Sequence, residues 1–232
     1  MNALSGQATS LLTGLATAMV TVTLAVLPFL TPGWVAFEQG RSNAAGWTGY
    51  TDAELSAATG SILSDLVFGP PGFDVQVRSQ AVLDERERGH MRDVKTVFSG
   101  LWVLAAIAVA FLVAASRRRD RRATWLAVRR GAIGLAVAVV GLGALALVAF
   151  DALFETFHQV LFPAGSYDFD PATERLVQLF PFQFWQETAV AVGVVVLLCC
   201  ALVATFAGAR LRHAARTGTA VAELSVVPGM HA

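Results

Sequence analysis

Two histidines of this chain stand beside carboxylates at helical spacing. His90 follows Glu87 by three residues and precedes Asp93 by three. His158 follows Glu155 by three. Residues three apart share one face of a helix, so each imidazole has an acidic neighbour. A carboxylate fixes the tautomer of a neutral imidazole and raises its basicity. The pair could therefore run acyl transfer, one histidine taking a proton from the attacking group and the other protonating the leaving oxygen.

Two other interpretations of these histidines stay open. Both sites read Glu-x-x-His, a pattern that holds two metal ions in some helical bundles, so a metal-dependent membrane enzyme is the second candidate. The third is a non-catalytic membrane protein whose histidines bond headgroups or loop carbonyls. No G-x-S-x-G motif is present, and Cys199 and Cys200 lie inside an apolar run. Serine or cysteine nucleophiles therefore have no candidate.

The composition indicates a chain largely dissolved in lipid. Hydrophobic residues make up 55% of its 232 residues and charged residues only 15%, against about 25% in soluble domains. Each of four apolar runs without charge is close to the ~20 residues that a helix needs to cross a bilayer. They are 11–30, 97–115, 131–150 and 188–209. We expect an all-α polytopic membrane domain over 1–210, with long loops at 31–96 and 151–187 containing short helices, and a flexible tail over 211–232.

The charges of the connecting segments predict the orientation. The two long loops hold 6 and 1 basic residues against 9 and 6 acidic ones. Arginines crowd the short segment between the second and third runs: Arg117, Arg118, Arg119, Arg121, Arg122, Arg129 and Arg130. The positive-inside rule places this segment and both termini in the cytoplasm of a cell membrane. Both long loops, with His90 and His158, then lie outside. At the foot of a span the arginines indicate topology, so no nucleic-acid partner is expected.

Shorter signals divide the loops. Thr51 and Glu54 have the spacing of a capping box, which predicts a helix that ends before the breaker at 69–72. From about Ser79 a helical pattern resumes and runs into the second apolar run. A turn at Asp170 starts another short helix that stops before Pro181.

Two sequence blocks resemble a known family. The first is His90-Met91-Arg92-Asp93-Val94-Lys95, which is similar to the H-x-x-D-V-K motif of the lipoprotein intramolecular transacylase (Lit) family. The second runs from Phe157-His158-Gln159 through Phe162-Pro163 and Asp170-Pro171 to the stretch Gln178-Leu179-Phe180-Pro181-x-x-Phe184-Trp185. Order and predicted topology also agree with that family over about residues 8–210.

The resemblance implies an enzyme that moves an acyl chain within a diacylated bacterial lipoprotein. The chain leaves the sn-2 ester of the glyceryl group and joins the α-amine of the N-terminal cysteine. The family's catalytic positions carry over to His90, His158 and Asp93, and Glu155 is the carboxylate expected to orient His158. Candidates for substrate contact are Arg92, Lys95, Tyr167 and Trp185. The expected partners are the lipid bilayer and the lipoprotein, without a cofactor.

Overall fold

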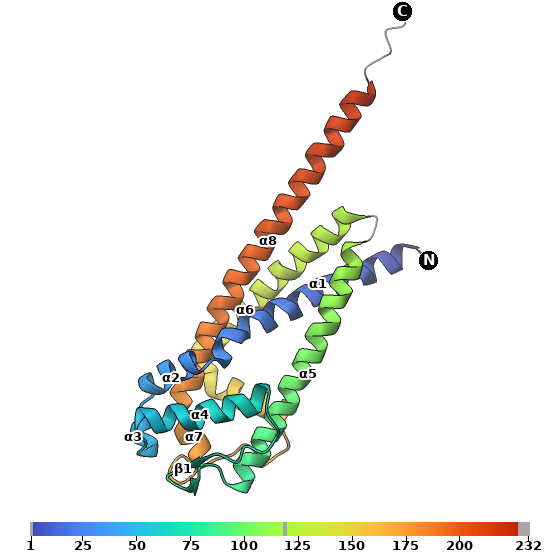
Figure 1. Ribbon diagram of the computed structural model, residues 1–232. Helices are drawn as coiled ribbons and strands as arrows, with labels where there is room; N and C mark the ends of the chain where they lie inside the picture. The colour runs from blue at the N-terminus through green and yellow to red at the C-terminus, as the bar shows by residue number, and fades with distance from the viewer. Residues whose placement is uncertain (1, 118–119, 227–232) are drawn as a thin grey trace, which may run out of the picture. The chain divides into compact units, whose positions relative to one another are not determined.

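Four long helices, with shorter helices and one hairpin between them, make up the described chain (Figure 1). The computed structural model describes residues 2–117 and 120–226. Within them, four helices are long and apolar enough to cross a membrane. They are α1 (Asn2–Val26, continued by the 3-10 helix η1, Leu27–Leu30), α5 (Glu85–Ser116), α6 (Arg121–Leu161) and α8 (Phe182–Val226). The predicted all-α fold with four spans is confirmed.

Helix α8 continues well beyond the apolar run 188–209 and ends at Val226. Residues 211–226 therefore extend this helix. The flexible tail expected over 211–232 stays a prediction, and its last residues, 227–232, lie outside the described residues.

The chain divides into two compact units. The first, called the span unit here, combines residues 1–22, 105–139 and 196–232. The second, called the loop unit, combines residues 23–104 and 140–195. Every residue predicted to act in catalysis or substrate contact belongs to the loop unit.

Small side chains let the helices of the span unit approach closely. Gly14 of α1 meets Gly131 of α6 backbone to backbone, and buried residues around them include Ala16, Ala127 and Ala132. Small residues at helix contacts are the usual solution in lipid, where packing rather than water exclusion drives association.

The hydroxyl groups of three buried threonines on α1 have hydrogen-bond partners within their own helix. The hydroxyls of Thr13, Thr17 and Thr21 each donate to the carbonyl four residues earlier, at 2.8 Å. All three side chains are buried. This back-bonding satisfies the polar groups within their own helix, which an apolar surrounding requires.

Short elements between the long helices build the loop unit. They are α2 (Pro32–Arg41), α3 (Ala44–Thr48), α4 (Asp52–Val67), β1 (Gln76–Val77), β2 (Gln80–Ala81) and α7 (Arg175–Leu179). Helix α4 turns its apolar face inward through Leu55, Ala58 and Ile62. This face packs against buried residues of the following hairpin and of α5 and α7, including Phe73, Val82, Leu83, Met91 and Leu179.

The capping box at the start of α4 forms as predicted. The Thr51 hydroxyl accepts from the Glu54 N–H, and the Glu54 carboxylate accepts from the Thr51 N–H. The helical pattern predicted from about Ser79 is wrong at its start, because β1 and β2 pair there as a hairpin and α5 begins at Glu85. Arg78 and Ser79 both take positive φ at the turn, 53° and 60°, which a two-residue hairpin of primed type requires.

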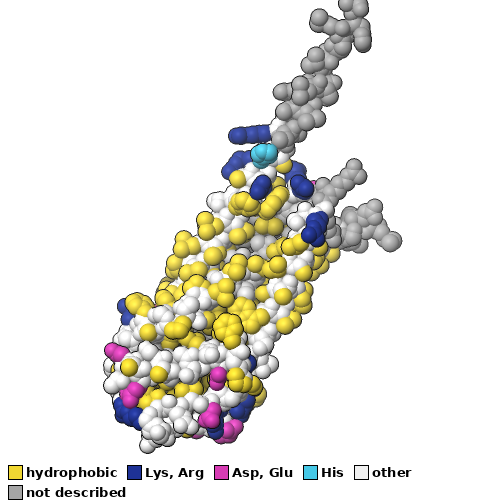
Figure 2. Space-filling model, viewed as in Figure 1, with side chains coloured by type: hydrophobic (Ala, Val, Ile, Leu, Met, Phe, Trp, Pro, Cys, Tyr) yellow, Lys and Arg dark blue, Asp and Glu magenta, His cyan; other side chains and the backbone are white. Residues whose placement is uncertain are grey.

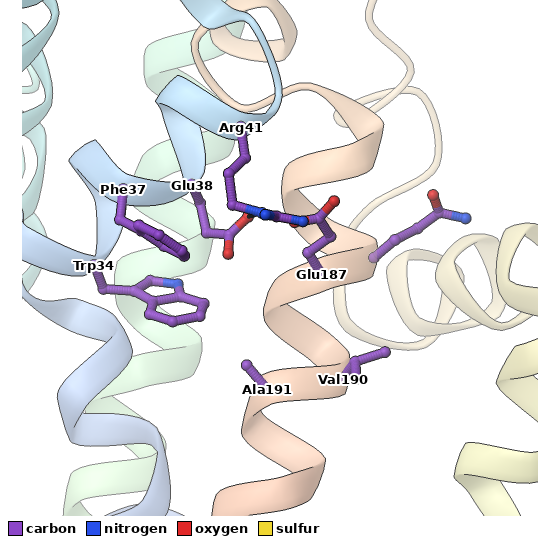
Figure 3. A pocket seen from close by; sticks show the side chains of 8 residues that line it. Trp34, Phe37, Glu38, Arg41, Glu187, Val190 and Ala191 are labelled. Carbon is purple, nitrogen blue, oxygen red and sulfur yellow. Dashed lines mark hydrogen bonds and ion pairs between the residues drawn. The ribbon is translucent and has the colours of Figure 1, made fainter.

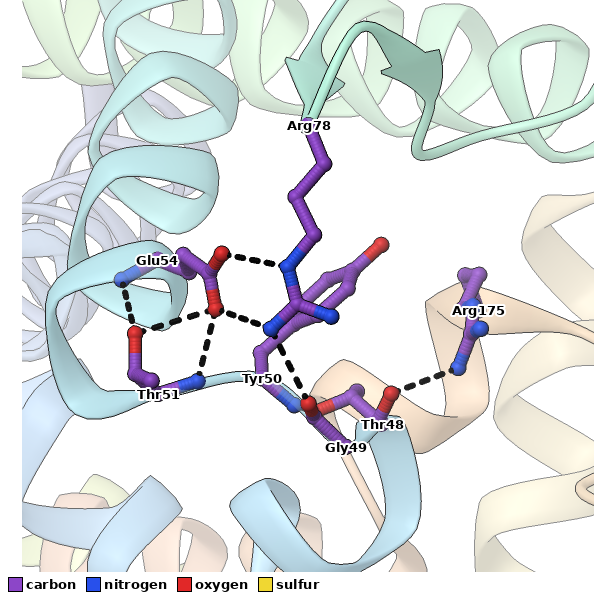
Figure 4. A network of polar contacts seen from close by, with 7 residues as sticks. All are labelled: Thr48, Gly49, Tyr50, Thr51, Glu54, Arg78 and Arg175. Carbon is purple, nitrogen blue, oxygen red and sulfur yellow. Dashed lines mark hydrogen bonds and ion pairs between the residues drawn. The ribbon is translucent and has the colours of Figure 1, made fainter.

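The Arg78 side chain ties this strained turn to α4 (Figure 4). Its guanidinium donates to both carboxylate oxygens of Glu54, at 2.6 and 2.7 Å. Nearby, Arg175 of α7 donates to the Thr48 carbonyl at 3.0 Å and lies over the Tyr50 ring. The contacts hold α3, α4, α7 and the hairpin together.

On the face in view, Asp and Glu side chains lie among Lys and Arg on the loop unit (Figure 2). Apolar side chains cover much of the long helices, whose ends in the span unit carry further Lys or Arg side chains. Exposed apolar residues on these helices include Leu15, Ile107, Val137 and Leu202, as expected for surfaces that face lipid.

Replacement of Gly131 by alanine should separate α1 from α6. A Cβ at this position would lie 2.4 Å from the Gly14 carbonyl oxygen and 2.6 Å from its Cα. We expect a loss of about 1–3 kcal/mol, as for other overpacked contacts. The measurement is thermal unfolding in detergent. Gly134→Ala is the matched control, because nothing lies within 4 Å of its added Cβ. Equal unfolding temperatures for the two variants would contradict the contact.

The Arg78–Glu54 pair should make stability depend on pH. The Arg78 hydrogen bond, followed by that of the Thr51 N–H, lowers the pKa of Glu54 from 4.5 to about 2. Because the folded pKa lies below the unfolded one, the pair stabilises above pH 4.5 and its effect disappears as pH falls toward 2. Arg78→Met should unfold at lower temperature than wild type at pH 7. The difference in unfolding temperature between wild type and Arg78→Met should become smaller in acid. A difference that stays constant with pH would refute the role of the pair.

Candidate active site

His90 lies in a buried aromatic pocket of the loop unit. It stands on the second turn of α5 and is 7% exposed. The rings of Phe162 and Phe169 meet it edge-on at centroid distances of 4.8 and 5.5 Å. Its Nδ1 is buried and has no hydrogen-bond partner among the described residues. Apolar burial of this kind favours the neutral imidazole over the imidazolium.

His158 stacks beside His90. The two ring centroids are 6.1 Å apart and the ring planes differ by 25°. Nδ1 of His158 lies 2.7 Å from the Phe154 carbonyl oxygen, one turn earlier on α6. A carbonyl only accepts, so Nδ1 carries the proton and Nε2 keeps its lone pair. The half-buried imidazole is therefore set up as a base at Nε2.

The backbone of α6 breaks before it reaches His158. Ala149 has φ −147° and ψ 40°, outside the helical region. The break separates the segment 150–161 from the longer part of the helix. The short segment carries His158 together with Phe154 and Phe157, whose rings lie 4.3 and 5.3 Å from the imidazole.

Arg86 clamps the segment after α6 against α5. Its guanidinium donates to the Asp168 carbonyl at 2.7 Å and forms an ion pair with Glu174. It also lies over the Phe169 ring, 4.6 Å from the centroid. Phe169 in turn contacts His90, so Arg86 holds in place one of the rings that cover this imidazole.

Glu87 connects α5 to α7. Its carboxylate accepts from the Asp84 N–H at 2.7 Å and from the Leu176 N–H at 2.6 Å, while the Asp84 side chain accepts from the Glu87 N–H. The residue is 2% exposed. It therefore caps the start of α5 and accepts from an N–H in the first turn of α7. Gln39 of α2 secures the other end of α7 by donating to the Leu179 carbonyl.

The remaining acidic and aromatic candidates lie around the two histidines. Asp93 is half-buried one turn after His90 on α5. Glu155 accepts from the Tyr167 hydroxyl at 3.3 Å and from the Gln159 amide at 2.9 Å, so its observed partners are not the imidazole. The Tyr167 ring lies 5.1 Å from that of His158. Trp185 is one layer further out, at 6.3 Å from the Phe154 ring.

The two basic candidates for substrate contact, Arg92 and Lys95, bind other groups of the protein. Arg92 pairs with Glu85 at 2.7 Å on the exposed side of α5. The Lys95 ammonium donates to the carbonyl of Asp65, to that of Gly69 at 2.9 Å and, more weakly, to that of Leu66. Lys95 thus caps the C-terminal end of α4. The substrate contacts predicted for Arg92 and Lys95 stay a prediction.

The Glu-x-x-His pattern does not assemble a metal centre in the described part of the chain. No group of three or more His, Cys, Asp or Glu residues is placed to hold an ion there. Both glutamates have other partners: Glu87 holds backbone N–H groups, and Glu155 holds Tyr167 and Gln159. The metal interpretation gains no support from these contacts.

Two contacts at the candidate site differ in how far the sequence could have predicted them. The Phe154 carbonyl that sets the tautomer of His158 could have been inferred from helical spacing, because it lies four residues earlier. The ring of Phe169 and the clamp by Arg86 could not, since 82 residues separate Arg86 from Asp168.

Fold and site together define a polytopic membrane protein with a pair of stacked histidines in its loop unit. The family model for the lipoprotein intramolecular transacylase Lit matches residues 11–185. The chain therefore belongs to the Lit family, a family of bacterial membrane-integral acyltransferases. The search of curated proteins gave no match.

Solved structures of Lit from Bacillus cereus share the fold. One matches with a TM-score of 0.77 at 18% identity, covering 92% of this chain and 98% of that one. Two variants of it, with a histidine replaced by arginine or by alanine, match with TM-scores of 0.73 and 0.69 at the same identity and the same coverage of this chain. The match covers 95% and 96% of the two variant chains.

Replacement of Lys95 by methionine should lower stability rather than catalysis. Removal of a charge-assisted bond from helix carbonyls costs about 1.5–3 kcal/mol, and α4 would lose its cap. We expect a lower unfolding temperature in detergent, with the acyl-transfer rate per folded molecule within about twofold of wild type. Arg92→Met is the control, because an exposed ion pair contributes about 0–1 kcal/mol. A large loss of rate in folded Lys95→Met would restore the substrate role.

Proposed function

We propose that this chain moves an acyl chain within a diacylated lipoprotein, from the sn-2 ester of the glyceryl group to the α-amine of the N-terminal cysteine. The observation that carries the proposal is the stacked pair His90 and His158, 6.1 Å apart in an aromatic pocket of a Lit family member. The Bacillus cereus structures are named as this intramolecular transacylase, which supports the same reaction class here.

In the proposed reaction, His158 moves the proton. The neutral α-amine attacks the ester carbonyl, an N–C bond forms, and Nε2 of His158 takes the amine proton. The C–O bond to the glyceryl group then breaks, and the imidazolium returns this proton to the departing oxygen. The Phe154 carbonyl holds the tautomer that makes Nε2 the base. One proton taken and one returned leave the enzyme unchanged.

His90 is proposed to stabilise the tetrahedral intermediate. As a neutral imidazole in an apolar pocket it can donate one N–H to the developing oxyanion, where such a bond is stronger than in water. Its buried, unpartnered Nδ1 leaves hydrogen-bonding capacity that a substrate group could use. Asp93, one turn away, would balance the positive charge that forms on the pair.

The surroundings suit aminolysis over hydrolysis. The rings of Phe157, Phe162 and Phe169 limit the access of water to the imidazoles. The Tyr167 ring lies beside His158 and its hydroxyl donates to Glu155, and Trp185 would contact the lipid part of the substrate. Both reacting groups belong to one bound molecule, so binding already supplies their proximity.

The orientation is part of the proposal. Acidic residues outnumber basic ones in both long loops, and arginines crowd the segment between the second and third spans. This asymmetry favours both termini in the cytoplasm and the histidine pair at the outer surface of the cell membrane, where lipoproteins present their N-terminal cysteine.

Mass spectrometry of a reporter lipoprotein tests the activity. Wild type should convert the diacylglyceryl form to a lyso form with an N-acyl chain. His158→Ala should lower the rate about 10²–10⁴-fold, the usual contribution of a general base, and His90→Ala should also lower it substantially.

Ser61→Ala is the control, because this exposed hydroxyl donates to the Ala57 carbonyl of its own helix, away from the histidine pair. An unmodified reporter with wild type, or full rates in both histidine variants, would refute the proposal. Loss of the wild-type rate on treatment with a chelator would instead favour the metal-dependent enzyme.

A further inference from the structure

A pocket of about 440 Å³ opens in the loop unit between α2 and the start of α8 (Figure 3). Its lining is Trp34, Phe37, Glu38, Arg41, Gln186, Glu187, Val190 and Ala191. No hydrogen bond or ring contact joins these described residues to His90 or His158. Trp185 faces the Phe154 ring, whereas Glu187, two residues further along α8, faces Arg41. The pocket is thus separate from the candidate active site.

Two carboxyl groups and one guanidinium meet in this pocket. Arg41 donates from Nε to Glu187 and lies 3.9 Å from Oε2 of Glu38. That oxygen is buried and has no hydrogen-bond partner among the described residues, and the Glu38 side chain is 3% exposed. Burial first, and the adjoining Glu187 carboxylate second, raise the pKa of Glu38. Two carboxyl groups therefore share one guanidinium, and a second cation would let both ionise.

Apolar surface continues from this charged row along α8. In Figure 3 the side chains of Arg41, Glu38 and Glu187 meet in one row, and Val190 and Ala191 lie beyond it on α8. Val190 and Ala191 lie at the start of the apolar run of α8. The Trp34 and Phe37 rings form the wall of the pocket on the α2 side. Val190 is 62% exposed and Phe37 57%. A charged row followed by apolar walls repeats the order of headgroup and acyl chain in a phospholipid.

We propose that this pocket binds a membrane phospholipid whose headgroup carries both a phosphate and a primary ammonium, as in phosphatidylethanolamine. The ammonium supplies this second cation and three donors to Glu38 and Glu187. The phosphate reaches the guanidinium of Arg41, whose side chain is 53% exposed, and the first acyl carbons lie on Trp34 and Val190. A choline headgroup has no N–H to donate, and a glycerol headgroup has no cation, so both should bind more weakly.

Native mass spectrometry of the purified protein in detergent tests the site. Phosphatidylethanolamine, phosphatidylcholine and phosphatidylglycerol with identical acyl chains are titrated separately. We expect wild type to retain the ethanolamine lipid with about tenfold higher affinity, the size of one charge-assisted hydrogen bond. Equal retention of the three lipids would overturn the proposal. Lipid binding is the only readout, so the result is independent of acyl transfer.

Substitutions in the pocket test where the lipid binds. Glu38→Gln and Arg41→Gln should each lower retention of the ethanolamine lipid about tenfold, because each removes a charge that the headgroup meets. The matched control is Arg88→Gln, which removes an arginine paired with Asp74 and Glu85 outside the pocket. Unchanged retention in folded Arg41→Gln would overturn the proposal.

A substitution at the apolar wall covers the case in which the charge variants fail to fold. Val190→Trp fills the pocket from an exposed position and leaves the ion pairs intact. We expect this variant to elute as the folded protein in size-exclusion chromatography and to lose the preference for the ethanolamine lipid. A folded Val190→Trp protein with wild-type preference would refute the site.

Discussion

The buried carboxylate of Glu87 is the interaction on which the arrangement of the loop unit depends. One side chain caps the helix that carries His90 and receives the N-terminal turn of α7, 89 residues later in the chain. A carboxylate in an apolar surrounding is costly unless donors surround it, so the contact admits few alternative geometries. It fixes the two long loops to each other, and the segment between α6 and α7 has to fold over His90 as a result.

The pocket produced in this way is rich in rings and poor in polar groups. Phe162 and Phe169 cover His90, and a backbone carbonyl rather than a carboxylate holds the tautomer of His158. In the proposed reaction such a site supplies proton transfer, and the substrate brings both its nucleophile and its acyl group. The acidic side chains lie at the edge, where Glu155 holds Tyr167 instead of an imidazole.

The sequence predicts those features whose information is local. Apolar runs of membrane length locate the spans, and the pairing of Thr51 with Glu54 locates the start of α4. The hairpin turn at Arg78 is missed because neither of its central residues is the Gly or Asn that usually marks positive φ. The hydrogen bonds of Lys95 are missed for another reason. Its carbonyl partners lie 26 to 30 residues away, and every residue has a backbone carbonyl, so no residue type marks such a partner in the sequence.

Because α6 breaks at Ala149, its last turns can tilt as one rigid segment. Nine residues separate Ala149 from His158, which at 1.5 Å per residue is about 13 Å of helix. A tilt of about 10° at the break would carry the imidazole roughly 2 Å, enough to lose a reacting geometry that tolerates about 1 Å. In the proposed reaction, the alignment of the two imidazoles therefore depends on Arg86, a partly exposed arginine that holds the segment after α6.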